Sequence, residues 1–126
     1  MDPRELQQRT KTFALRIIKL VRYLQKDPIG KIIANQQLLR CGTGVAANYR
    51  AACRAQSVKH FISKLSLVVE EADESQFWLE ILMEAKIVKP DQVKGLLQEA
   101  GEIVAIMTAS KNSAIKNQKK AAVNFI

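Results

Sequence analysis

The sequence contains few of the residues that interrupt regular structure. Its 126 residues include only five glycines and three prolines. An all-β domain needs a turn about every ten residues and therefore more of both residue types. Hydrophobic residues make up 48% and charged residues 25%, a balance that disfavours intrinsic disorder. The composition predicts one folded domain over residues 1–126, built mainly from long helices.

Residues that perform catalysis or bind metals are also scarce. The chain has one histidine, His60, and two cysteines, Cys41 and Cys53. Two cysteines are too few for a disulfide scaffold, and their place in a helical pattern predicts buried free thiols in a reducing compartment. No Ser-His-Asp set and no metal-ligand spacing occurs in the sequence. We therefore predict a protein that is not an enzyme and needs neither metal nor cofactor.

Long apolar runs are missing as well. No segment approaches the roughly 20 consecutive apolar residues that a membrane-spanning helix needs. The first five residues, Met1 to Glu5, are polar or charged apart from Met1 and Pro3, and no apolar region of a signal peptide follows them. The sequence predicts a cytoplasmic protein without membrane contact.

Three breaks divide the chain into four long segments. Pro28 and Pro90 fit the first position of a helix, and Ser57 fits an N-cap. The breaks predict helices at residues 3–26, 29–54, 58–87 and 90–117. They leave open whether the tail, residues 118–126, extends the last helix. Apolar residues recur at spacings of three and four on one face of the first, third and fourth segments; these stripes include Phe13, Ile17, Leu20 and Leu24, then Leu65 and Leu79, and Met107. We therefore expect an all-α, up-down-up-down antiparallel four-helix bundle.

The second of these segments is apolar on two faces. One stripe comprises Ile32, Leu39, Thr43, Ala46 and Cys53, and the other comprises Leu38, Val45, Tyr49 and Ala52. A helix of a four-helix bundle buries only one face, so a second apolar face must be buried against a further protein surface. The third segment also carries apolar residues off its main stripe, among them Trp78. We predict a homo-oligomer whose interface includes Leu38, Val45, Tyr49 and Trp78; a thick core with irregular patterning is the alternative.

Positive charge is concentrated in the first half of the chain. The formal net charge is +8, and residues 1–54 carry eleven basic side chains against three acidic ones. Helical periodicity places five cations of the first segment on one face: Arg4, Lys11, Lys19, Arg22 and Lys26. Together with Arg50 and Arg54 they are candidates for contacts to the phosphates of RNA or DNA. A solvated face is the alternative, because only Tyr23 lies nearby for base stacking.

The acidic cluster at residues 70–74 has a structural explanation. Paired carboxylates serve acid-base chemistry or metal binding in some helical bundles, but the single histidine lies elsewhere in this sequence. If the second and third segments form a hairpin around residue 56, Arg40 lies opposite the cluster. We therefore predict a partly buried structural ion pair of Arg40 with Glu71 and Glu74.

The central hairpin also carries a family resemblance. Gln37-Leu38-Leu39-Arg40, Thr43 and Ala47-Asn48 match the pattern Gln-Leu-x-Arg, Thr-Ser-Ile-x-Ala-Asn, and Ala51-Ala52 replace the Glu-Gly pair that follows it. Residues 61–65 and 70–80 add to the match. The chain resembles the bacterial four-helix-bundle family first noticed as reading frames within intervening sequences of 23S ribosomal RNA genes. That family is similar to the accessory variability protein of diversity-generating retroelements.

The resemblance implies an assembly and a class of partner. It implies a ring-shaped homopentamer of four-helix bundles with basic surfaces that bind RNA or DNA. The partners of the retroelement relatives are an RNA and a reverse transcriptase, so a reverse transcriptase is an implied partner if a retroelement encodes this chain. We therefore expect a non-enzymatic nucleic-acid-binding protein that uses the first helical hairpin. The alternative is a protein–protein adaptor or scaffold with no nucleic-acid role.

Overall fold

Helices joined by short turns account for nearly all of the chain. The computed structural model describes the backbone of residues 1–125 and the side chains of residues 1–123. The elements are α1 (Pro3–Leu24), α2 (Pro28–Ile33), the π-helical turn η1 (Ala34–Leu38), α3 (Leu39–Cys53), α4 (Val58–Glu84) and α5 (Pro90–Phe125). Because α2, η1 and α3 follow one continuous path, the described residues form four long helices and no strand. The predicted all-α fold with four helices is confirmed.

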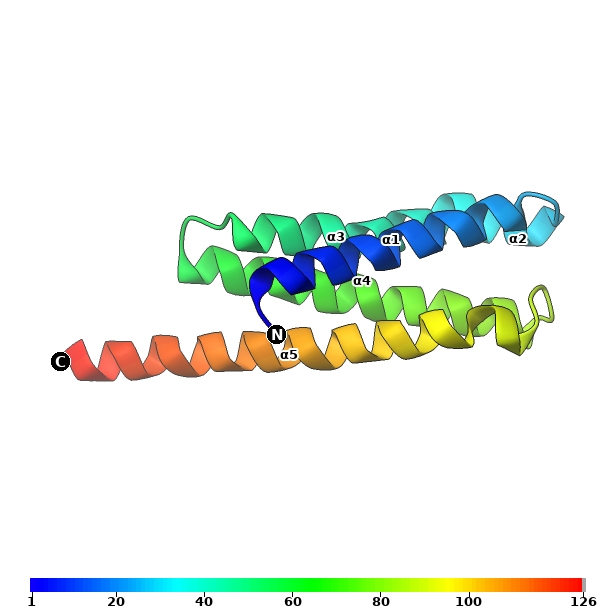
Figure 1. Cartoon of the computed structure of the whole chain (residues 1–126). Helices are drawn as coiled ribbons and strands as arrows, with labels where there is room; N and C mark the ends of the chain where they lie inside the picture. Colours follow the sequence, from blue (N-terminus) through cyan, green and yellow to red (C-terminus); the bar gives the residue numbers. More distant parts are fainter. Residues whose placement is uncertain (126) are drawn as a thin grey trace.

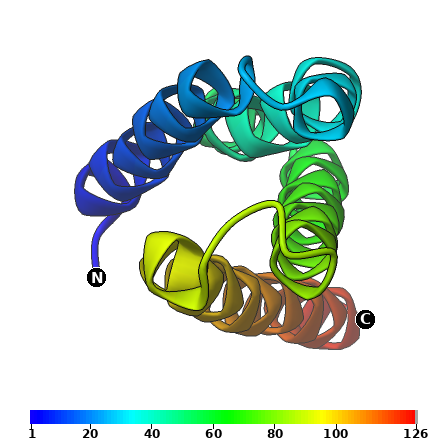
Figure 2. The ribbon, with the colours of Figure 1, turned by 90° about the vertical axis from the view of Figure 1, so that its right-hand side faces the viewer.

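The four helices run alternately up and down. Figure 1 shows α1 and α4 running in one direction and α3 and α5 in the other. The end view in Figure 2 shows the helices arranged around a common centre in chain order. The α1 helix contacts α3 more extensively than it contacts α5, so the α1–α5 side is the thinner seam of the bundle. None of the described helices is both long enough and apolar enough to cross a membrane.

The predicted helix starts are confirmed by their caps. The Ser57 hydroxyl accepts a hydrogen bond from the His60 backbone N–H at 3.1 Å. The Asp27 carboxylate accepts one from the Gly30 N–H at 2.8 Å and thereby caps the helix that begins at Pro28. The α5 helix begins at Pro90. These side chains satisfy backbone donors that the first helical turn leaves unpaired.

The helix ends differ from the predicted ones. The α4 helix stops at Glu84, three residues early, because Lys86 takes a left-handed conformation with φ 61°. The Ile87 N–H then bonds to the Leu82 carbonyl at 3.0 Å, and the Lys86 N–H to that of Met83 at 3.0 Å. This pair of bonds closes the helix in a Schellman arrangement. The α5 helix passes the predicted end at residue 117 and continues to Phe125, so the described part of the tail extends it.

The predicted core stripes of the first, third and fourth helices face the centre of the bundle. Phe13 and Ile17 of α1, Leu65 and Leu79 of α4 and Met107 of α5 are all fully buried. Interdigitated side chains of this kind provide most of the free energy that stabilises a small helical domain.

The predicted oligomer interface is wrong for the three of its four residues that lie on the second helical segment. Leu38, Val45 and Tyr49 are 0%, 0% and 4% exposed, because they point into the core of their own chain. Val45 and Tyr49 are larger and more apolar than Thr43 and Ala46 of the other stripe, so their burial removes more apolar surface from water. In that other stripe Ile32 is 52% exposed and Cys53 is exposed, whereas Leu39, Thr43 and Ala46 are half-buried. The burial predicted for Cys41 is confirmed, and that predicted for Cys53 is wrong.

The α1 and α3 helices approach closely at Gly42. A Cβ atom at this position would lie 2.7 Å from Ile17 Cγ2 and 2.8 Å from Ile17 Cγ1. Ile17 is fully buried and β-branched, so its side chain has few alternative rotamers. Glycine at residue 42 is therefore what allows the two helices to lie this close.

A charged cluster connects α1 to α5 across the thinner seam. The Arg9 guanidinium donates to both carboxylate oxygens of Glu99, at 2.7 and 2.8 Å, and to Glu102 at 2.8 Å. The hydrogen bond to Glu99 is the largest cause that raises the pKa of Arg9 above its ordinary value. The hydrogen bond from Arg9 is likewise the largest cause that lowers the pKa of Glu102. This two-pronged arginine fixes the position of α1 along α5.

We expect Gly42→Ala to lower the free energy of unfolding by about 1–3 kcal/mol, since the new methyl group overlaps Ile17. Gly101→Ala is the matched control. Its Cβ would meet only the Gln76 amide at 3.6 Å, so it should raise stability by up to about 1 kcal/mol. Urea unfolding followed by circular dichroism measures both. Equal effects of the two substitutions would contradict a close approach at Gly42.

Candidate nucleic-acid interface

A basic groove lies between the N-terminal half of α1 and the C-terminal half of α3. Its volume is about 590 Å³. Four cationic side chains line it, two from α1 and two from the end of α3: Arg4, Lys11, Arg50 and Arg54. The remaining lining residues are Gln7, Gln8, Thr43, Ala46 and Ala47, so no carboxylate lies among them. The groove therefore presents positive charge and amide groups to any occupant.

The groove depends on small residues in α3. Thr43, Ala46 and Ala47 lie on the outward face of the helix and form the part of the groove between the cations. The Thr43 hydroxyl donates to the Leu39 carbonyl at 2.6 Å, so the side chain folds back on its own helix. Side chains this short leave the surface hollow between two helices whose spacing Gly42 sets.

The structure divides the seven predicted phosphate contacts into two groups. Arg4, Lys11, Arg50 and Arg54 lie together in the groove. Lys19 and Arg22 are exposed on the C-terminal half of α1, Lys26 is exposed in the turn that follows it, and none of the three lines the groove. The α1 helix ends at Leu24, so the predicted end at residue 26 is wrong by two residues. The Lys26 ammonium lies 3.7 Å from the centre of the Tyr23 ring in a cation–π contact. The five cations predicted to form one stripe on the first helix are therefore divided, and only two of them share the groove with Arg50 and Arg54.

Sequence reasoning missed Gln7 and Gln8 as groove residues. Charge counting overlooks neutral side chains, and periodicity alone does not show that they turn toward α3. The signal that was available is their position between Arg4 and Lys11 on the exposed side of α1.

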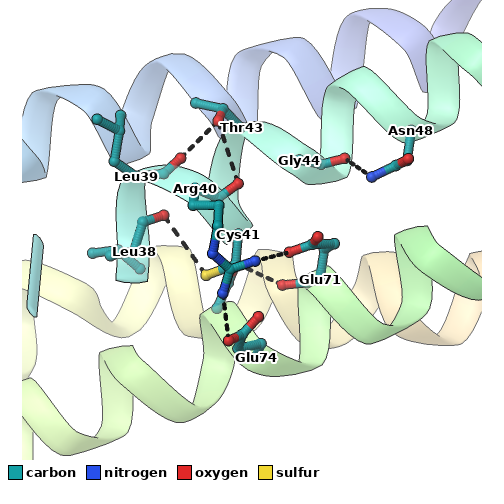
Figure 3. A network of polar contacts seen from close by, with 10 residues as sticks. Leu38, Leu39, Arg40, Cys41, Thr43, Gly44, Asn48, Glu71 and Glu74 are labelled. Atoms are coloured by element: carbon teal, nitrogen blue, oxygen red, sulfur yellow. Dashed lines mark hydrogen bonds and ion pairs between the residues drawn. The ribbon is translucent and has the colours of Figure 1, made fainter. Parts of the chain in front are cut away.

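The predicted partners of Arg40 lie where hairpin geometry places them (Figure 3). Arg40 Nη2 is 2.7 Å from Glu74 Oε1, and Arg40 Nη1 is 3.4 Å from Glu71 Oε2. The Arg40 side chain is 54% exposed, so the arginine is less buried than predicted. Gly44 leaves room for the Glu71 carboxylate, because a Cβ there would lie 3.1 Å from Glu71 Cδ. The cluster therefore links α3 to α4.

Glu71 and Glu74 differ in how strongly they interact with Arg40. Burial is the largest cause that raises the pKa of Glu71 above its ordinary value of 4.5, and it outweighs the opposing charge of Arg40. The pKa of Arg40 is raised mainly by its hydrogen bond to Glu74. Glu74 is therefore the principal partner of Arg40, and Glu71 is largely a desolvated carboxylate.

A buried serine and cysteine lie beneath this ion pair. The Ser75 hydroxyl lies 3.3 Å from Cys41 Sγ and 2.8 Å from the Glu71 carbonyl oxygen. Burial raises the pKa of the Cys41 thiol, which keeps it protonated and unreactive. His60 is exposed at the start of α4. Among residues 1–125, no group of three or more His, Cys, Asp or Glu side chains is placed to hold a metal ion.

Trp78, the fourth predicted interface residue, is half-buried on α4. Its ring packs edge-on against Phe77, with ring centres 5.0 Å apart, and Phe77 is 50% exposed. The Trp78 indole N–H is buried and has no hydrogen-bond partner in the described structure. The outward face of α4 therefore combines aromatic surface with the acidic residues of the 70–74 cluster.

Comparison with known proteins identifies the family. The family described as 23S rRNA-intervening sequence protein matches residues 4–109. The chain belongs to this family. A crystal structure from Bacteroides thetaiotaomicron, of a protein with unknown function from the S23 ribosomal protein family, is also similar. It shares 29% sequence identity and a TM-score of 0.82, over 89% of this chain and 99% of that one. No curated protein matches the chain.

The family match accounts for the recognised hairpin and agrees with the helical fold. The matched region ends at residue 109, whereas α5 continues to Phe125. Residues 110–125 of α5 thus lie outside the part that the family model covers.

We expect Glu71→Gln to remove one component of the pH dependence of stability. A carboxylate whose pKa is raised by folding binds more protons when folded, so stability falls as the pH rises above about 4.5. The glutamine variant lacks this fall. The difference in stability between the variant and the wild type should therefore be more favourable to the variant at pH 7 than at pH 4. Thermal unfolding at several pH values measures the difference. Glu74→Gln is the control and should retain the fall.

Proposed function

We propose that this protein is a non-enzymatic nucleic-acid-binding protein that holds RNA through the groove between α1 and α3. The observation that carries the proposal is the convergence of Arg4, Lys11, Arg50 and Arg54 on one hollow that no carboxylate lines. Solvated protein surfaces ordinarily intersperse charges of both signs. A hollow with positive charge alone attracts a polyanion and concentrates it at the site.

The chemistry of the groove favours the phosphate backbone over the bases. Arginine guanidinium groups bind phosphate oxygens in a two-pronged geometry, and three of the four cations are arginines. The Gln7 and Gln8 amides can donate to phosphate or sugar oxygens. No aromatic side chain lines the groove, so it offers no surface for base stacking. Binding is therefore expected to depend little on base sequence and strongly on salt.

The double substitution Arg50→Gln and Arg54→Gln should weaken RNA binding. We expect the affinity of the wild type for a structured RNA to fall steeply between about 50 and 200 mM salt, and the slope of log K against log salt to decrease by about one per arginine removed. Fluorescence anisotropy at several salt concentrations measures both quantities.

Lys86→Gln with Lys89→Gln is the matched control for this variant. It removes the same charge from two exposed residues at the α4–α5 turn and should leave the slope nearly unchanged. Absence of RNA binding by the wild type at about 50 mM salt would refute the proposed function. Capture of a defined protein that survives nuclease treatment, without RNA binding, would instead favour an adaptor.

We also propose that the protein assembles into a ring-shaped homo-oligomer, a pentamer, by contact of α1 in one copy with α4 in the next. The outward face of α4 presents Phe77 and Trp78 beside Glu70 and Asp73. The C-terminal half of α1 and the turn after it present Leu15, which is 58% exposed, beside the second group of cations: Lys19, Arg22 and Lys26. The two faces are complementary in charge and both carry exposed apolar surface.

Contact between two different faces is head to tail, and head-to-tail contacts close into rings when the rotation permits. This arrangement uses the three cations outside the groove and leaves the groove cations free for RNA. Neighbouring grooves would then repeat around the ring and act together on a long RNA.

We expect Phe77→Asp, and separately Leu15→Asp, to dissociate the assembly. Each places a charge in apolar surface that the neighbouring copy covers. Light scattering at micromolar concentration should give a multiple of 14.1 kDa for the wild type and a lower mass for both variants. Val58→Asp, at a residue that is 51% exposed and lies outside both faces, is the control and should not change the mass. A wild-type mass of one chain would refute the assembly.

A further inference from the structure

The last part of α5 has properties that the bundle does not require. We define the arm as residues 110–125, the part of α5 beyond the region that the family model matches. The side chains from Lys116 to Val123 are all exposed, so this part of the arm has little contact with the bundle, whereas Ile115 and several residues before it are half-buried. Figure 1 shows the C-terminal end of α5 extending past the turn between α3 and α4. The arm continues as a helix because it grows from a packed helix and needs no nucleation of its own.

The charge of the arm has one sign. Glu102 is the last acidic residue of the chain, and the arm contains four lysines: Lys111, Lys116, Lys119 and Lys120. None of these lysines forms an ion pair with a carboxylate in the described part of the chain. A solvated helix usually alternates acidic and basic residues three and four apart, which stabilises it. The arm lacks this compensation.

Three of the lysines share a face. At about 100° per residue, Lys116, Lys119 and Lys120 fall within an arc of about 100°. Lys116 is three residues before Lys119 and four before Lys120, so like charges repel at both helical spacings. Attraction between lysines and the negative end of a helix acts only over the last turn, and these three residues precede that turn. The arm therefore bears a repulsion that a bound polyanion would relieve.

The arm and the basic groove lie at the same end of the bundle. Arg50 and Arg54 are at the end of α3, next to the α3–α4 turn, and Arg4 is in the first turn of α1. Because α1 and α4 begin and α3 and α5 end on this side, the helix ends that carry these cations lie at one end of the bundle (Figure 1). The groove lies on the α1–α3 side and α5 on the opposite side of the bundle (Figure 2), so only an RNA long enough to pass around this end contacts both.

We propose that the arm is a second phosphate-binding element, through which Lys116, Lys119 and Lys120 extend the contact of an RNA beyond the groove. This inference rests on the proposed function. It assigns to residues outside the family's matched region the role of binding the backbone of a long RNA. An RNA that fills only the groove gains nothing from the arm, whereas a longer one contacts both.

The test replaces Lys116, Lys119 and Lys120 together by glutamine in the full chain. Single-stranded RNAs of about 6 and about 25 nucleotides are compared by anisotropy at several salt concentrations. For the long RNA we expect the salt slope to fall by about two to three and the affinity to fall about tenfold or more at low salt. For the short RNA we expect no change.

The matched control replaces Lys86, Lys89 and Lys94 by glutamine. It removes the same charge from exposed residues at the opposite end of the bundle. Helical content by circular dichroism checks that both variants fold. If the arm variant and the control bind the long RNA equally, the arm has no role, and the groove proposal stands provided the Arg50/Arg54 variant binds weakly. If the wild type binds neither of these RNAs, the arm proposal fails, and the groove proposal is decided by the binding of the structured RNA described above.

A competition experiment distinguishes RNA from an acidic polypeptide as the ligand of the arm. Poly-glutamate of similar charge is offered as a competitor to the long RNA. If poly-glutamate binds the wild type more tightly than the RNA does, and the arm substitutions abolish that binding, the arm is a site for an acidic protein and the assignment to RNA is overturned. Weak competition that is unaffected by the arm substitutions supports the assignment.

Discussion

The close contact between α1 and α3 at Gly42 is the constraint on which the rest of this surface depends. Ile17 lies where a side chain at residue 42 would be, so the two helices are held at a spacing that only glycine permits. That spacing seals the core on one side, where Val45 and Tyr49 are buried. On the other side it leaves a hollow above small α3 residues, and cations of both helices line it. The contact between Gly42 and Ile17 thus determines both the packing of α1 on α3 and the shape of the candidate binding site.

Ion pairs also link these two helices to α4 and α5. Arg9 binds Glu99 and Glu102 across the thinner α1–α5 seam, and Arg40 binds Glu74 between α3 and α4. These pairs use acidic residues from the second half of the chain to neutralise two of the eleven cations in the first half. The cations of residues 1–54 without such a pair are those of the groove, those of the C-terminal half of α1, Lys26 in the turn after α1 and Lys31 in α2. The distribution of ion pairs therefore shapes the basic surface as much as the basic residues themselves do.

Much of the fold could be predicted from local signals in the sequence. Pro28, Ser57 and Pro90 mark helix starts because their backbone and capping preferences act over a single turn. The core stripe from Phe13 to Leu24 follows from the helical period. The stripe of the second segment was misassigned because both of its faces are apolar, and periodicity alone does not say which face has room at the centre. The π-helical turn at Ala34–Leu38 adds to this ambiguity by shifting the phase of the helix.

The number and order of the helices, the excess of positive charge in the first half and the family resemblance of the central hairpin all follow from the sequence. All of these depend on residues near one another along the chain. The tertiary structure alone decided that Arg4 and Lys11 face Arg50 and Arg54 across a hollow, and that Lys19, Arg22 and Lys26 lie outside it. It also placed the lysines of the α5 arm at the same end of the bundle as the groove. The reason is physical: a helical period gives the face of one helix, whereas the angle and spacing between two helices depend on side chains such as Gly42 and Ile17 that meet only after folding.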